Sequence, residues 1–115
     1  MANEYIHYLK IVESREGSNP AASIDDIERQ LLHHILLSHH QDQPLLVGDL
    51  IGLSQIGSQA TLHRRIKNLE AFGFIRLDFC KNDGRKRFVV PKRLADQYLV
   101  FMSQCITESF KRAKQ

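Results

Sequence analysis

Polar and basic residues are concentrated between positions 58 and 68. They are Ser58, Gln59, Thr61, His63, Arg64, Arg65, Lys67 and Asn68. Amide, hydroxyl and imidazole groups form hydrogen bonds with base edges, whereas guanidinium and ammonium groups bind phosphate oxygens. A helix with both kinds of group near its start has the chemistry needed to read a nucleic acid duplex. The alternative is an amphipathic surface helix whose basic face is only solvated.

A second basic cluster surrounds the turn sequence Asn-Asp-Gly at 82–84. Its cations are Lys81, Arg85, Lys86 and Arg87. Asp-Gly is typical of tight turns between strands, and Asp83 can accept hydrogen bonds from Arg85 or from turn amides. A guanidinium at such a tip can enter a narrow, electronegative minor groove. The alternative is an ordinary Asp-Gly turn between charged strand ends.

The charge of the chain is unevenly distributed. Residues 58–93 hold ten basic and three acidic residues, a net charge of +7, within a chain whose total is +3. Residues 1–57 hold three basic and eight acidic residues, a net charge of −5. A basic segment in an otherwise acidic or neutral chain is typical of a phosphate-binding surface.

The hydrophobic spacing predicts the elements that position these residues. We expect helices over 24–39 with Ser23 as N-cap, over 45–53, from the N-cap Ser58 to Ala71, and over 94–111. Leu62, Ile66 and Leu69 should face inward, and Gly73 should end its helix with a positive φ. Residues 74–79 and 88–90 suit the two strands of a hairpin.

This order of elements predicts a mostly helical α+β protein with a winged helix-turn-helix domain and flanking N- and C-terminal helices. With 115 residues, we expect an N-terminal segment and linker over 1–22, the DNA-binding domain over 23–93, and a C-terminal helix over 94–115.

The segments TLHRRIKNLEAFGFI and DGRKRFVV resemble winged helix-turn-helix bacterial transcription regulators, and most of all the MarR family. The matching positions are Thr61, Arg64, Leu69, Glu70, Gly73, Ile75, Asp83 and Arg85. The resemblance implies a recognition helix in the major groove, a basic wing on the flanking groove, and a homodimer that reads a roughly palindromic duplex. It implies that the dimer is joined through the N- and C-terminal helices.

The C-terminal helix carries more apolar surface than one domain face needs, which favours a dimer interface. The residues predicted to form it are Leu94, Tyr98, Phe101, Met102 and Ile106. The alternative is packing of this helix against its own domain.

Other kinds of site have little support in the sequence. A cluster of four histidines is not accompanied by any metal-binding motif: His33, His34, His39 and His40. We interpret them as surface histidines whose charge responds to pH. Cys80 and Cys105 suit small buried hydrophobes, with a redox-sensing thiol as the alternative. We expect no catalytic set, metal or cofactor, and a cytoplasmic protein without a membrane span. The sequence does not identify a small-molecule effector.

A winged helix can instead be a protein-interaction module that binds no specific DNA. The polar residues Gln59, Thr61 and His63 discriminate between the two functions, because a protein interface would more often show exposed aromatic residues there. The sequence favours double-stranded DNA as the partner.

Overall fold

The computed structural model describes residues 2–113 of the chain. Along the chain the elements are α1 (Asn3–Ser14), the 3-10 turn η1 (Glu16–Ser18), α2 (Asp26–His40), α3 (Val47–Ile51), α4 (Gln59–Ala71), β1 (Ile75–Phe79), β2 (Arg87–Pro91) and α5 (Arg93–Ala113). The predicted class, a mostly helical α+β winged helix-turn-helix, is confirmed. Residues 1, 114 and 115, which end the predicted segments 1–22 and 94–115, lie outside the described residues.

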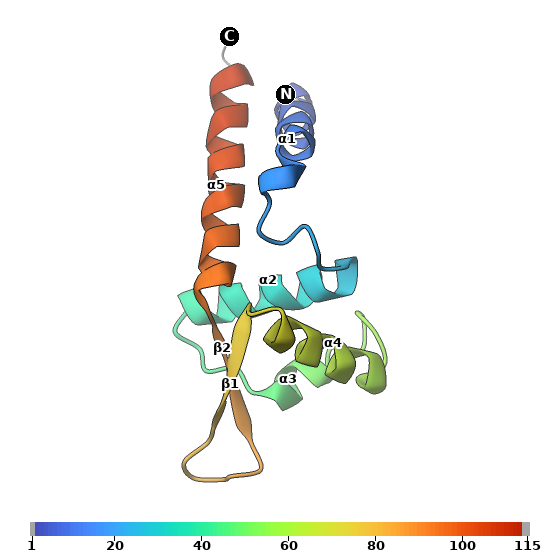
Figure 1. Cartoon of the computed structure of the whole chain (residues 1–115), viewed down its shortest axis with the longest axis vertical. Coiled ribbons are helices and arrows are strands. Elements are labelled where there is room, and N and C mark those ends of the chain that lie inside the picture. The colour runs from blue at the N-terminus through green and yellow to red at the C-terminus, as the bar shows by residue number, and fades with distance from the viewer. Residues whose placement is uncertain (1, 114–115) are drawn as a thin grey trace. The chain divides into compact units, whose positions relative to one another are not determined.

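The chain forms two compact units. One comprises residues 24–95, and the other comprises residues 1–23 together with 96–115. The first unit contains α2, α3, α4 and the hairpin, and in Figure 1 the hairpin extends from these helices to a loop at its end.

The core of the 24–95 unit forms where the inner faces of its helices meet the base of the hairpin. Helix α2 packs against α4 and β2, and α3 packs against α4 and β2. The residues that fill this core include Leu31, Leu32, Ile35, Leu50, Leu62, Ile66, Leu69, Phe74, Ile75 and Val89. Leu62, Ile66 and Leu69 are buried as predicted, because spacings of four and three place them on one helix face.

The two strands pair in antiparallel register, from Ile75 opposite Pro91 to Phe79 opposite Arg87. A third short stretch joins this sheet: Leu46 bridges to Phe88, and the amide of Val89 donates to the carbonyl of Leu45 at 2.8 Å. This pairing explains why the helix predicted over 45–53 begins only at Val47. Leu46 is extended, with φ −94° and ψ 155°.

Caps fix the ends of the helices next to the polar residues. The prediction of Ser23 as N-cap of α2 is wrong, since Asp25 caps it instead. Asp25 and Glu28 form a reciprocal capping box, with bonds of 2.8 and 2.9 Å to each other's backbone amides. Ser58 caps α4 as predicted, and Gly73 follows α4 with φ +89°.

In the second unit, α1 packs along α5. Ile11, Phe101 and Cys105 are buried together, with Tyr8, Val12 and Met102 packed around them. An ion pair between Arg15, the residue that follows α1, and Glu108 of α5 adds to this packing.

Candidate nucleic-acid interface

Helix α4 presents one exposed polar face. Gln59, His63, Arg64 and Lys67 are exposed on it, next to the exposed cap residue Ser58. At 100° per residue Arg64 and Lys67 point away from the buried leucine and isoleucine face, and His63 lies at its edge. Gln59 is aligned with Ile66 but is exposed because it lies in the first turn. The structure therefore brings together five of the eight polar residues predicted on this helix.

Thr61 is hydrogen-bonded to the N-cap Ser58 at the start of the helix and is not fully exposed. The hydroxyl of Ser58 donates to Thr61 Oγ1 at 2.9 Å, and the amide of Thr61 donates to Ser58 Oγ at 3.2 Å. Thr61 is half-buried, and its methyl group lies near Gly57.

Arg65 and Asn68 face α2. Arg65 Nη1 lies 2.9 Å from Asp25 Oδ2 and 3.6 Å from Glu28 Oε2. Asn68 Nδ2 donates to the same Glu28 oxygen at 2.9 Å. Asn68, one of the polar residues predicted to contact DNA, is thus directed at α2, and the guanidinium of Arg65 is engaged by carboxylates of its own domain. Both side chains are half-buried because α2 covers this flank of α4.

The loop from Cys80 to Lys86 is held by its own hydrogen bonds. The amide of Cys80 donates to the carbonyl of Lys86 at 2.9 Å, and the amide of Lys86 donates to the carbonyl of Asp83 at 3.0 Å. Asp83 Oδ1 accepts from the Arg85 amide at 3.0 Å and from Arg85 Nε at 3.4 Å, the interaction that the turn sequence suggested. The Arg85 side chain is nonetheless 94% exposed, so its charge remains accessible to a partner. Lys81, Lys86 and Arg87 are also exposed.

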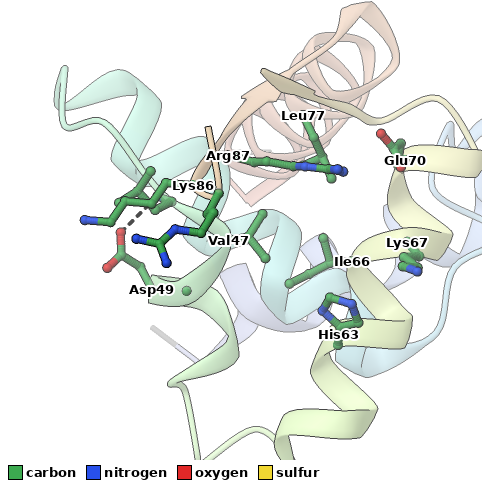
Figure 2. A pocket seen from close by; sticks show the side chains of 12 residues that line it. Val47, Asp49, His63, Ile66, Lys67, Glu70, Leu77, Lys86 and Arg87 are labelled. Carbon is green, nitrogen blue, oxygen red and sulfur yellow. Dashed lines mark hydrogen bonds between the residues drawn. The ribbon is translucent and has the colours of Figure 1, made fainter. Parts of the chain in front are cut away.

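A hollow of about 480 Å³ separates the polar face of α4 from the hairpin (Figure 2). Its lining includes apolar side chains (Leu46, Val47, Ile66, Leu77), cations or imidazole (His63, Lys67, Arg85, Lys86, Arg87) and two carboxylates (Asp49, Glu70). Figure 2 shows Arg87 reaching alongside Leu77 from the hairpin, while Ile66 and His63 face the hollow from α4. The predicted recognition helix and the predicted wing thus border one concave surface.

One contact of the hairpin was absent from the sequence predictions. The guanidinium of Arg87 lies 4.8 Å from the ring centre of Phe79, which is 65% exposed. The strand pattern included Phe79, but the pairing of these two residues depends on the register of the hairpin. In the sequence, the only indication of this contact is that the aromatic residue Phe79 lies next to the basic loop.

The residues predicted at a dimer interface lie in different environments. Leu94 is half-buried, Tyr98 and Phe101 are buried, and Ile106 is 57% exposed. Phe101 and Met102 contact α1 of the same chain, which the prediction did not include. Further large apolar side chains of this unit are exposed: Tyr5, Ile6, Leu9, Val100 and Phe110.

The remaining candidates form no second site in the described part of the chain. Cys105 is buried and Cys80 half-buried, and both are free thiols. Burial raises the pKa of the Cys105 thiol, with a smaller opposing effect of Arg15. Within residues 2–113, histidine, cysteine and acidic side chains form no group of three that could hold a metal ion. No helix in that range is both long and apolar enough to cross a membrane.

Solved structures with little sequence identity share this architecture. The transcriptional regulator Tm0710 from Thermotoga maritima superposes with a TM-score of 0.67 at 16% identity, over 95% of this chain and 77% of its own. AbsC, a MarR family transcriptional regulator from Streptomyces coelicolor, gives a TM-score of 0.59 at 16% identity, over 94% of this chain and 72% of its own. The fold is of the MarR type.

A third similar structure, reduced AbfR bound to DNA, gives a TM-score of 0.56 at 19% identity, over 89% of this chain and 65% of its own. No protein-family model matches the chain, and no curated protein is similar to it in sequence. The likeness to these structures therefore concerns the fold alone.

Proposed function

We propose that this protein is a sequence-specific regulator of transcription, without enzymatic activity, that binds double-stranded DNA. The observation that carries the proposal is the hollow shared by α4 and the hairpin, with exposed cations on both sides. A convex duplex backbone fits between two such elements, and the basic side chains match its phosphates. In this proposal residues 23–93 form the DNA-binding domain.

Gln59, His63 and Arg64 are the candidates for base contacts in the major groove, because they are exposed near the start of α4. Lys67 is placed to contact phosphate. Lys81, Arg85, Lys86 and Arg87 would contact the flanking groove, with Asp83 holding the shape of the loop. AbfR, one of the proteins with a similar fold, is described as bound to DNA, which supports the choice of partner.

We further propose a homodimer in the cytoplasm. The unit that contains α1 and α5 exposes Tyr5, Ile6, Leu9, Val100 and Ile106, and a large exposed apolar surface favours association. The 94–115 segment and the N-terminal segment 1–22 would supply that surface. A dimer would place two copies of α4 on a roughly palindromic duplex.

The test is selection of duplexes from a random-sequence pool, followed by fluorescence anisotropy of a selected duplex against a scrambled one. Measurements at about 50 mM and 200 mM salt separate phosphate contacts from base readout, because each released counterion steepens the salt dependence. We expect tighter binding to the selected duplex, a steep loss of affinity with salt, and two chains per duplex.

Equal binding of both duplexes would overturn sequence specificity. Absence of binding at the lower salt concentration would favour the other candidate function, a module that binds an acidic protein partner. The exposed face of α4 speaks against that candidate, because its exposed residues are polar, charged or alanine (Gln59, Ala60, His63, Arg64, Lys67, Glu70 and Ala71).

A further inference from the structure

We propose that Phe79 is a positioning residue that holds the guanidinium of Arg87 on the inner side of the hairpin, ready to bind a DNA phosphate. The inference rests on the proposed DNA-binding function and assigns a role to a residue outside the basic clusters. The key juxtaposition is the guanidinium carbon of Arg87 at 4.8 Å from the Phe79 ring centre. That distance is within the range of a cation–π interaction.

The register of the hairpin makes this contact a fixed feature of the wing. Phe79 and Arg87 are directly opposite each other, and theirs is the last pair of the β1–β2 ladder. One more hydrogen bond, from the Cys80 amide to the Lys86 carbonyl, closes the loop immediately beyond this pair. The backbone on both sides of the contact is therefore anchored.

The pair lies on the face of the hairpin that looks toward α4. Side chains alternate along a strand, so Phe79 shares its face with Leu77, and Arg87 shares its face with Val89. Leu77 and Arg87 both line the hollow, together with His63 and Lys67 of α4. Arg87 thus lines the hollow from the strand β2, whereas Arg85, which also lines it, belongs to the loop.

The choice of an aromatic partner has a chemical consequence. Arg76 is paired with the carboxylate of Asp78 at 3.1 Å, and Arg85 with that of Asp83 at 3.4 Å. A carboxylate neutralises part of the charge of a guanidinium and occupies its N–H donors. A ring face attracts the cation without accepting its in-plane N–H groups, so the positive charge and the donors of Arg87 remain available to phosphate oxygens.

The same contact reduces the cost of binding. A free arginine side chain loses much of its rotamer freedom when it is fixed on a phosphate. A guanidinium already resting on a ring loses less. This role explains why a phenylalanine occupies the last position of β1. Phe79 is 65% exposed there, so its burial contributes little to the stability of the fold.

A double-mutant cycle tests the proposal. Affinity for a duplex selected on the wild-type protein is measured by anisotropy for wild type, Phe79→Leu, Arg87→Ala and the double variant. We expect Phe79→Leu to weaken binding about 2- to 5-fold, the range of an exposed cation–π contact. In the Arg87→Ala background the same change should have no effect. Phe79→Tyr, which keeps the ring face, should restore wild-type affinity.

Two controls separate positioning from general damage. In an Arg85→Ala background, Phe79→Leu should still cost its full 2- to 5-fold, because Arg85 does not touch the ring. The thermal midpoint of Phe79→Leu should fall by no more than several degrees, as expected for the loss of one exposed contact, so the variant stays folded at the assay temperature. In the free protein, ring-current shifts of the Arg87 side-chain protons should be seen in the wild type and lost in Phe79→Leu.

The outcomes are distinguishable. An unchanged affinity of Phe79→Leu, an equal loss in the Arg87→Ala background, or the absence of ring-current shifts each overturn the positioning role while leaving DNA binding intact. Failure of the wild type to bind any selected duplex overturns the proposed function, and this inference with it.

Discussion

Arg65 and Asp25 form an ion pair of 2.9 Å between α4 and the N-cap of α2, forty positions apart in the chain. Asn68 adds a 2.9 Å hydrogen bond to Glu28, whose side chain also completes the capping box of α2. Glu28 is only 3% exposed, so these partners provide the hydrogen bonds that water cannot reach to make. The side of α4 that carries Arg65 and Asn68 is thereby attached to the start of α2. The side that carries Arg64 and Lys67 remains exposed.

Replacement of Arg65 by alanine should lower the free energy of unfolding by about 1–2 kcal/mol, because it leaves the buried Glu28 and the half-exposed Asp25 without their cation. Chemical denaturation measures this loss. Arg64→Ala is the matched control, since Arg64 is exposed and its replacement should change stability by less than about 0.5 kcal/mol. Equal stability of the two variants would contradict the structural role of Arg65.

Replacement of Arg64 by alanine should weaken binding to the selected duplex by about 1–3 kcal/mol and flatten the base preference at one position of each half-site. The physical reason is loss of a guanidinium that would face the major groove in the proposed complex, from the first turns of α4. Anisotropy with a set of single-base variants measures both effects. Unchanged affinity together with unchanged preference would exclude Arg64 from base readout.

Replacement of Arg85 by alanine should weaken binding to every duplex by a similar factor and reduce the salt slope by about one unit. Arg85 is 94% exposed in the loop, so in the proposed complex it would contact the phosphate backbone rather than a base edge. Anisotropy over a salt series on selected and scrambled duplexes provides the measurement. A loss confined to the selected duplex would instead indicate base or groove-shape readout by Arg85.

Protonation of His33 should contribute to the pH dependence of the free energy of unfolding. Partial desolvation on the surface of α2, and to a lesser extent the charges of Arg29 and His34, hold the pKa of His33 below its usual value. Below the unfolded-state pKa of about 6.5, the unfolded chain therefore binds the proton more tightly than the folded protein does. The free energy of unfolding should consequently fall as the pH is lowered from about 7.5 to about 5.5.

Urea denaturation across this pH range tests the expectation, with His33→Gln as the variant. The substitution should make the fall shallower, because glutamine does not titrate. A profile parallel to that of the wild type would show that His33 does not contribute to the slope.

The features of the fold that were predicted correctly are those that local patterns determine. Leu62, Ile66 and Leu69 follow helical spacing, Ser58 precedes a helix with a hydroxyl at the right position, and only glycine readily takes the φ of +89° found at Gly73. The N-cap of α2 was missed although its signal was present. Asp25 is followed three positions later by Glu28, which makes a reciprocal box that Ser23 cannot form.

The features that were missed depend on neighbours far along the chain. Helical periodicity distinguishes the buried side of α4 from the rest, but it cannot tell that α2 covers the flank of Arg65 and Asn68. The start of α3 moved to Val47 because Leu46 pairs with Phe88 of the hairpin. The Phe79–Arg87 contact requires the strand register, which the loop length and its hydrogen bonds set.

The bond from Val89 to Leu45 makes the residues before α3 a part of the hairpin's sheet. Main-chain bonds do not depend on which side chains surround them. Changes to the polar residues of α4 or to the cations of the loop would therefore leave the attachment of the residues before α3 to the hairpin unaltered. In the proposed function, substitutions at these positions could change the preferred target sequence during evolution, while the hairpin stays attached to the segment before α3.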